Sequence, residues 1–301
     1  MKPGRRLETC ATEVARLRRE IAADAHTRAT VGAVKQWQAQ RLARTHRRLL
    51  GDPRYAAAAR FFLDDLYGAK DFSRRDAELA RLVPTMVRLL PDAALETIAD
   101  AIEIVAAAGH DGKRFHLVGH DWGGQVSWGV AGRHPERLAS LTILSRPHPS
   151  SFRRALQKEG GDQKNRSRHH RAFLEPDTAK LLLADNARRL REGLFGQGVP
   201  AAALEEHLSV LGNPEALEAA LAWYRSNKGL AADIGTIAVP TLYIWGDVDA
   251  TVGPDAAYGT AEFVAPSFAM EVLPNVGHFV MDQAPAKATD LLLAHLRKHP
   301  V

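Results

Sequence analysis

The sequence of 301 residues has few of the features that indicate a membrane protein, a disulfide scaffold or a cysteine-based metal site. Its single cysteine, Cys10, excludes an intrachain disulfide and any cysteine-based zinc site. No apolar run approaches the length that spans a bilayer, and the N-terminus lacks the apolar core of a signal peptide. We therefore expect a cytoplasmic protein that does not contact a membrane.

The sequence also lacks a concentrated basic region. Lys and Arg number 40 against 35 Asp and Glu, a net charge of +5, and the basic residues are dispersed among Glu, Asp and Ala. The densest basic stretch, residues 163–171, is more typical of a solvated helix face or cap surface than of a nucleic-acid contact. We expect no nucleic-acid partner.

Residues 115–124 carry the motif around which the chain is organised, Phe-His-Leu-Val-Gly-His-Asp-Trp-Gly-Gly. A strand of β-forming residues passes into a Gly-x-Asp-x-Gly turn, and helical spacing follows it. This pattern is typical of a nucleophile elbow that exposes its central residue, Asp121. We expect Gly119 and Gly123 to be required, because such a sharp turn leaves no room for side chains at those positions.

An aspartate at the elbow indicates direct attack on carbon. A carboxylate is ionised near neutral pH and needs no base to become a nucleophile. Such an attack suits an sp3 carbon that carries a leaving group, and it leaves an ester on the enzyme that water must then hydrolyse. Hydrolysis needs a base and an acidic partner, but neither step requires a metal or an organic cofactor, so we expect none.

Two downstream loops offer the base and its partner. Residues 240–246 are predicted to form a buried strand, followed by Asp247 and Asp249. A later loop carries His278 at its tip. The order nucleophile, acid, histidine is the one that α/β-hydrolases use.

Residues from about 106 to 301 resemble the C-terminal two thirds of an α/β-hydrolase of the epoxide hydrolase and haloalkane dehalogenase group. The matching motifs are Gly-His-Asp-Trp-Gly-Gly at 119–124, Arg-Pro-His-Pro at 146–149, Trp-Tyr-Arg at 223–225, Trp-Gly-Asp-Val-Asp at 245–249 and Gly-His-Phe at 277–279. The resemblance implies that Asp121 is the nucleophile and that His278 activates water. It also implies that Asp249, rather than Asp247, orients His278.

The resemblance implies a small-molecule substrate, an epoxide or a haloalkane. Epoxide hydrolases use two cap tyrosines as hydrogen-bond donors to the epoxide oxygen. Tyr224 matches one of them. The region expected to hold the other contains His169 and His170 instead of a tyrosine. Trp122 matches a halide donor of dehalogenases, but epoxide hydrolases also carry tryptophan at this position. The backbone N–H of Trp122 corresponds to one of the family's two oxyanion-hole donors. Tyr224 favours an epoxide hydrolase, with a haloalkane dehalogenase and an inactive remnant as alternatives.

The predicted fold class is α/β: a partial α/β-hydrolase with a doubly wound, mostly parallel sheet and a helical cap. We expect an all-helical N-terminal region at 1–104, a hydrolase domain at 105–301 and a cap insertion at about 150–235. Strands are predicted at 115–118, 141–144, 241–245 and 268–272.

The front of the α/β-hydrolase fold is not recognisable in this sequence. The family's His-Gly-x-Pro-type loop supplies the second oxyanion donor, but the sequence contains no His-Gly dipeptide. Residues 61–68 instead resemble an uncharacterised family of bacterial helical proteins, which implies no activity. The elbow strand would then have an unpaired outer edge, which the N-terminal helices or a homo-oligomer would cover.

Overall fold

The computed structural model describes residues 93–226, 234–265 and 267–301. It also describes six earlier helical residues, namely Ala29, Ala33, Gln36, Trp37, Gln40 and Arg41. The predicted helical region 1–104 therefore lies mostly outside the described residues; its described end is helix α6 (Ala93–Val105). Trp37 and Arg41 contact this helix, since they bind Glu103 at 2.9 Å and Asp100 at 2.5 Å respectively.

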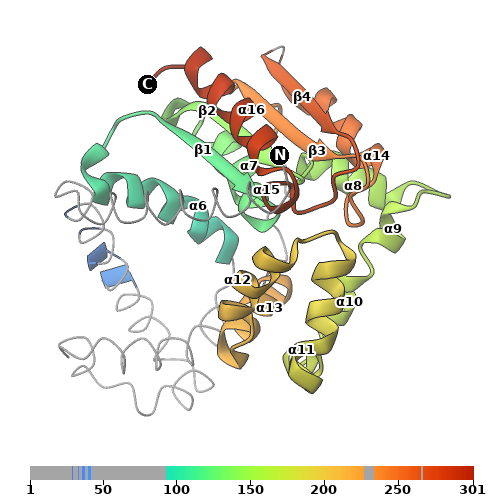
Figure 1. The fold of residues 1–301 in the computed structure, drawn as a ribbon. Helices are drawn as coiled ribbons and strands as arrows, with labels where there is room; N and C mark the ends of the chain where they lie inside the picture. The colour runs from blue at the N-terminus through green and yellow to red at the C-terminus, as the bar shows by residue number, and fades with distance from the viewer. Residues whose placement is uncertain are drawn as a thin grey trace, which may run out of the picture.

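A four-stranded parallel sheet forms the centre of the described fold (Figure 1). Its strands, in spatial order, are β1 (Phe115–His120), β2 (Leu138–Leu144), β3 (Thr241–Gly246) and β4 (Phe268–Leu273). Each strand includes the range predicted from the sequence, and the α/β class is confirmed. All seven residues of β2 are buried, as expected for an apolar strand with helices on both sides.

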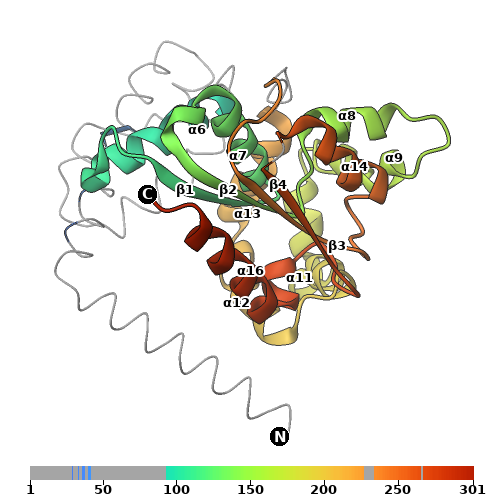
Figure 2. The ribbon, with the colours of Figure 1, turned by 90° about the horizontal axis from the view of Figure 1, so that it is seen from above.

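Helices cover both faces of this sheet (Figure 2). One face carries α6, α7 (Trp122–Arg133), α8 (Pro149–Gln157) and α14 (Pro254–Tyr258). The other carries α15 (Val280–Gln283) and α16 (Pro285–Lys298). The fully buried Trp128 and Tyr243 pack in the first layer, and Ile244 and Val280 pack in the second. Short helical turns complete the connections: η1 (Ala106–His110), η2 (Pro135–Arg137) and η3 (Gly259–Phe263).

A run of short and long helices between β2 and β3 forms a separate layer (Figure 1). Its members are α9 (Gln163–Arg166), α10 (His169–Ala172), α11 (Thr178–Gly196), α12 (Ala201–Leu211) and α13 (Pro214–Ser226). Helix α8, which the predicted cap at 150–235 includes, instead packs Phe152 and Ala155 into the core beside the sheet. The cap layer therefore begins at α9, because the apolar face of α8 is buried against α14 and η3.

Strand β1 lies at one edge of the sheet. Within the described ranges no strand pairs with its outer side. Val118 on this strand is 43% exposed. The homo-oligomer expected at this edge stays a prediction.

None of the helices in the described ranges combines the length and the apolar character that crossing a bilayer requires.

Candidate active site

Asp121 occupies a tight turn between β1 and α7. Its backbone has φ 46° and ψ −114°, a conformation that L residues rarely adopt and that costs free energy. The backbone N–H of Asp121 donates to the carbonyl oxygen of Leu144 at 3.4 Å, and its own carbonyl accepts from the N–H of Gln125 at 2.9 Å. The turn therefore presents the carboxylate at the C-terminal edge of the sheet, where ligands of parallel α/β folds bind.

Two glycines at the elbow are required for space, but they are not both the predicted ones. A Cβ on Gly119 would lie 2.4 Å from Ser127 Oγ and 2.5 Å from the carbonyl oxygen of Gly123. A Cβ on Gly124 would lie 2.8 Å from Arg146 Cβ. A Cβ on Gly123 would have no atom within 4 Å, because this residue faces a cavity, so the expectation for Gly123 is wrong.

We expect Gly119→Ala and Gly123→Ala to differ in stability. Gly119→Ala should lower the free energy of unfolding by about 2–3 kcal/mol, because β1 and α7 must move apart to admit the methyl group. Gly123→Ala should change it by less than about 1 kcal/mol, in the stabilising direction, since alanine favours the helix. Urea unfolding of both variants measures the difference, and equal destabilisation would contradict this account of the turn.

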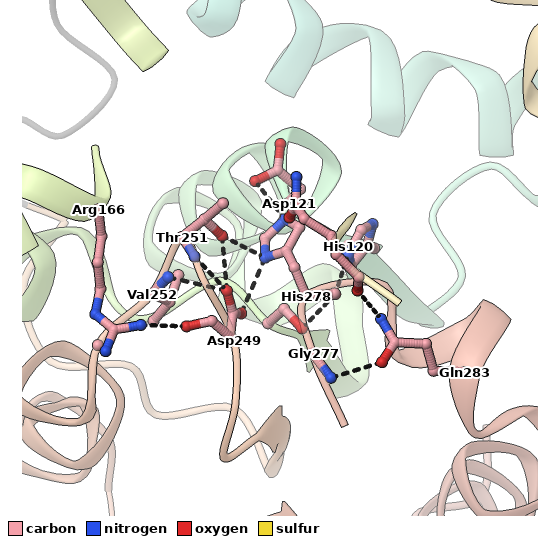
Figure 3. Close-up of polar contacts among 12 residues, drawn as sticks. His120, Asp121, Arg166, Asp249, Thr251, Val252, Gly277, His278 and Gln283 are labelled. Atoms are coloured by element: carbon pink, nitrogen blue, oxygen red, sulfur yellow. Dashed lines mark hydrogen bonds and ion pairs between the residues drawn. The ribbon is translucent and has the colours of Figure 1, made fainter. Parts of the chain in front are cut away.

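The structure brings together the three residues that the sequence singled out as a triad (Figure 3). Asp121 follows β1, Asp249 follows β3 and His278 follows β4. His278 Nε2 lies 3.2 Å from Asp121 Oδ1, and His278 Nδ1 lies 2.9 Å from Asp249 Oδ2. Asp249 is fully buried and His278 is 5% exposed, so solvent scarcely screens these contacts.

A loop network fixes the carboxylate of Asp249. Its Oδ1 accepts from the backbone N–H groups of Thr251 at 2.7 Å and Val252 at 3.0 Å, and from the Thr251 hydroxyl at 2.8 Å. Oδ2 is thereby directed at His278, whose Nδ1–H also contacts Thr251 Oγ1 at 2.6 Å. Sequence reasoning missed Thr251, although a threonine two residues after an aspartate is a known turn signal. Asp247 is exposed and accepts from the N–H of Asn275 at 2.7 Å instead.

The backbone of His278 is held as firmly as its ring. Its carbonyl oxygen contacts Ser145 Oγ at 2.8 Å and His120 Nε2 at 2.9 Å. The preceding N–H, of Gly277, donates to Gln283 Oε1 at 2.7 Å (Figure 3). His120, which adjoins the nucleophile in sequence, therefore supports the histidine loop. These bonds restrict the imidazole to one orientation between the two carboxylates.

The electrostatics of the site favour an ion triad in the resting protein. Burial would raise the pKa of Asp121, but the hydrogen bond and charge of His278, with the charges of Arg146 and His120, hold it well below its usual range. Burial likewise opposes charge on His278, yet its hydrogen bonds to Asp121 and Asp249 raise its pKa to about 10. At neutral pH His278 is therefore an imidazolium whose charge depends on the charge of Asp121.

We expect this dependence to be measurable by NMR titration of the His278 ring. Asp121→Ala should lower the pKa of His278 from about 10, because one of its two stabilising carboxylates is removed. Asp255→Ala, which removes an exposed carboxylate paired with Lys158, should leave it unchanged. Since the folded-state pKa is raised above 6.5, the wild-type protein should lose stability as the pH rises from about 6.5 to about 10. A pKa of His278 near 6.5 in the wild type would contradict the ion triad.

An aromatic cluster from α7, α10 and α13 faces the nucleophile. The Tyr224 ring lies 5.1 Å from Trp122, 5.2 Å from His170 and 4.9 Å from Phe173, measured between ring centroids. Burial and the charge of Asp121 raise the pKa of Tyr224 to about 12, although a hydrogen bond with Trp122 acts in the opposite direction. Tyr224 lines the cavity, and a phenol that keeps its proton can donate a hydrogen bond there.

The two cap histidines lie in this cluster but present neutral rings. Burial lowers the pKa of His169 and lowers that of His170 to about 4. His169 Nδ1 contacts the carbonyl oxygen of Arg166 at 3.1 Å, so this nitrogen carries the proton. A neutral His169 in that tautomer presents Nε2 as an acceptor. His169 is therefore not arranged as a second acid beside Tyr224.

Arg146 is a buried cation that sequence reasoning treated only as part of a motif. Its Nε donates to Gln125 Oε1 at 2.9 Å, and its guanidinium lies over the rings of Phe152 and Trp122 at 4.5 and 5.4 Å. Burial lowers its pKa, and the charge of Asp121 acts in the opposite direction. Arg146 thus contributes positive potential at the elbow from behind Trp122. The only signal in the sequence was its place two residues after β2.

A cavity of about 830 Å³ lies between the sheet edge and the cap helices. Asp121, Trp122, Tyr224 and His278 all line it, so the Asp121 carboxylate, the imidazole and the phenol reach one space, while Asp249 lies behind His278. In the part of the chain that the structure describes, no three His, Cys, Asp or Glu side chains are grouped as metal ligands. The arrangement places the carboxylate of Asp121, a histidine held by a second carboxylate, and the phenol of Tyr224 around a mainly apolar space.

Two family models match the sequence. The alpha/beta hydrolase fold matches residues 65–285, and a domain of unknown function (DUF8198) matches residues 17–110. The second match extends the weak resemblance of residues 61–68 to an uncharacterised family. The two matches overlap at 65–110, which includes α6.

Named relatives and solved structures point to the same fold. Epoxide hydrolase 4 of Mus musculus is 27% identical over 212 residues, covering 67% of this chain and 58% of the relative. Monoacylglycerol lipase abhd6-A of Xenopus laevis is 29% identical over 208 residues, covering 63% and 57%. The crystal structure of Bacillus megaterium epoxide hydrolase in complex with an inhibitor superposes with a TM-score of 0.59 at 22% identity, covering 68% of this chain and 76% of that one. The chain thus spans less than two thirds of the length of these curated relatives.

Proposed function

This chain belongs to the alpha/beta hydrolase fold family, and from that premise we propose that it hydrolyses a small electrophilic substrate, an epoxide, through an ester on Asp121. The observation that carries the proposal is the continuous contact from Asp121 through His278 to Asp249, with distances of 3.2 and 2.9 Å. Relatives named as epoxide hydrolases support the substrate class.

In the first step a carboxylate oxygen of Asp121 attacks an epoxide carbon. The C–O bond of the ring breaks, and its electron pair passes to the epoxide oxygen. Tyr224, which lines the cavity with Asp121, donates its phenol proton to that oxygen and is left as a phenolate. Because the pKa of Tyr224 is raised to about 12, the proton is present at neutral pH.

In the second step water cleaves the ester. Alkylation removes the charge of Asp121, so the pKa of His278 falls and His278 releases its Nε2 proton. This proton passes through solvent to the Tyr224 phenolate and restores the phenol. Neutral His278 then accepts a proton from water as the water oxygen attacks Cγ of Asp121. The backbone N–H of Trp122 stabilises the tetrahedral anion. Collapse of this anion expels the alcohol oxygen, which takes the proton from His278 and gives the diol. The carboxylic acid left on Asp121 then passes its proton to Nε2 of His278, which restores the carboxylate and the imidazolium.

The position of Tyr224 in the same cavity as Asp121 supports an epoxide over a haloalkane. A departing halide needs N–H donors but no proton, whereas a departing alkoxide needs a proton. Here Tyr224 lines the cavity together with Asp121, and it keeps its phenol proton at neutral pH because its pKa is raised to about 12. The alternative of a dehalogenase is tested by assaying a bromoalkane beside the epoxide: turnover of the bromoalkane alone would replace the proposal.

We expect Tyr224→Phe to lower kcat for epoxide opening by about 10²-fold, because general-acid assistance is lost while the ring packing is kept. Tyr258→Phe is a matched control, since Tyr258 is 55% exposed on α14 and does not line the cavity. Diol formation measured by chromatography gives both rates. An undiminished rate in Tyr224→Phe would contradict the role of the phenol.

Single-turnover labelling tests the ester itself. Protein in excess over styrene oxide is incubated in H₂¹⁸O, and the diol and the peptide that contains Asp121 are analysed by mass spectrometry. The proposal expects an unlabelled diol in the first turnover and ¹⁸O in Asp121, because water attacks Cγ of the ester. Label appearing at once in the diol would indicate direct attack by water, and the absence of any diol from folded protein would indicate an inactive remnant.

We further propose that residues 105–301 form the hydrolase domain and that 1–104 form a separate helical region. The match of the domain of unknown function to residues 17–110 supports a separate N-terminal region. Its border lies within the overlap of the two matches at 65–110, and α6 belongs with the hydrolase domain because Ile98 packs in the core of the sheet.

A second copy of the chain that pairs along the outer edge of β1 would cover the exposed side of that strand. Light scattering of the purified protein measures the expected dimer, and a monomer at all concentrations would contradict it.

A further inference from the structure

Three arginines line the cavity, and two of them have no role in the triad, whereas Arg166 donates to the carbonyl oxygen of Asp249 at 2.5 Å. Arg168 precedes α10 and Arg189 lies on α11; both are exposed and both line the cavity, so they lie where it opens to solvent. Within the described ranges neither guanidinium has a hydrogen-bond or ion-pair partner. Other arginines nearby are paired: Arg166 with Asp162 at 2.6 Å, and Arg191 with Glu205 at 2.5 Å.

The charge around this cavity is one-sided. Asp121 is the only carboxylate residue among the described residues that line it. Its charge is already matched by His278 at 3.2 Å and by the buried Arg146. The two unpaired guanidinium groups therefore leave positive potential at the mouth, which favours an anion there.

The rest of the wall is apolar. It consists of side chains from the cap helices and of one residue after the histidine, namely Phe173, Leu182, Leu190, Leu194, Leu211, Leu217, Leu221, Trp223 and Phe279. With about 830 Å³, the cavity lies in the upper part of the range for ligand pockets and accepts a long chain. A ligand that satisfies both regions has an apolar body and an anionic end.

We propose that the substrate is an amphipathic anion: an apolar chain that carries the electrophilic carbon, with a carboxylate or phosphate head group bound by Arg168 and Arg189 at the mouth of the cavity. This inference rests on the proposed function for the electrophilic carbon and on the unpaired arginines for the head group. Guanidinium groups bind carboxylates and phosphates in the same way, with two parallel N–H donors to two oxygens. The same site can therefore accept either head group.

Binding of unreactive ligands tests the head-group site without any need for turnover. Calorimetry on the full chain compares undecanoate, decyl phosphate and decanol, which share a decyl chain and differ in the head group. We expect the anions to bind with a Kd about tenfold lower than decanol, and the comparison of undecanoate with decyl phosphate identifies the favoured anion. The preference should weaken as salt is raised, because the arginines are exposed. Equal Kd values for anions and decanol would overturn the proposal.

Variants locate the effect. The double variant Arg168→Ala, Arg189→Ala should lose the preference for the anions over decanol. Arg188→Ala, on the same helix but outside the cavity and paired with Asp185 and Glu192, should retain it. A preference that persists in the double variant would overturn the assignment to these residues.

The same ligands separate this inference from the proposed function. Turnover of styrene oxide without any preference among the decyl ligands would refute the anion site and leave the hydrolase intact. An arginine-dependent preference in a protein that opens no epoxide would refute the hydrolase and leave the anion site. With both present, a terminal epoxide that bears a carboxylate should show a kcat/KM about tenfold above that of its methyl ester.

Discussion

Replacing His278 with glutamine is expected to turn the protein from a catalyst into a reagent that reacts once. Ester formation needs only the carboxylate of Asp121, but hydrolysis of the ester needs a base at the position of Nε2, 3.2 Å from Asp121 Oδ1. Glutamine cannot accept the proton, so we expect hydrolysis to slow by about 10³- to 10⁴-fold. Intact mass spectrometry after incubation with styrene oxide should show the protein with one added substrate mass.

The pH dependence of this variant provides a second readout. His278 holds the pKa of Asp121 down, so His278→Gln raises that pKa. Ester formation in the variant should therefore increase with pH through the raised pKa of Asp121, in a range where the wild-type carboxylate is already fully ionised. His207→Gln, a histidine on α12 that pairs with Asp282, serves as the control and should not accumulate ester. Steady diol formation by His278→Gln would refute the role of His278 as the base.

Asp121→Ala is expected to abolish both the ester and the diol. The variant lacks the atom that attacks the substrate, and removal of a nucleophile that acts as a unit with its base costs about 10⁴-fold or more in kcat. Combining it with His278→Gln should cause little further loss, because the two residues serve one reaction path. Asp255→Ala, which removes an exposed carboxylate on α14, should turn over at the wild-type rate. Ester detected on Asp121→Ala would show that another residue is the nucleophile.

The sequence was most informative where contacts are local. The elbow could be predicted because strand, turn and helix are contiguous, and the strands because their apolar runs are bounded by turn residues. The expectation for Gly123 failed because the crowded glycines of this elbow are Gly119, which lies against Ser127, and Gly124, which lies against Arg146. These contacts arise from the packing of the folded chain. Spacing alone does not indicate which glycine faces a cavity.

Several functional side chains depend on packing between distant segments. Arg146, which follows β2, and Tyr224, on α13, both contact the ring of Trp122 on α7. These three segments are far apart in the sequence. Arg168 and Arg189 are unpaired because, within the described ranges, no acidic side chain lies close enough to bind them. The spacing of residues in the sequence cannot predict this absence. The preference for Asp249 over Asp247 agreed with the geometry because it came from the offset in the family motif.

The spatial order of the strands, β1-β2-β3-β4, is also their order of synthesis. Among the described strands, each one pairs with the strand translated before it, and none has to insert between two earlier strands. Asp121, Asp249 and His278 follow β1, β3 and β4, so they are translated in the same order as those strands. In the proposed reaction, a chain that stops after β3 would carry the carboxylate that forms the ester without the base that clears it.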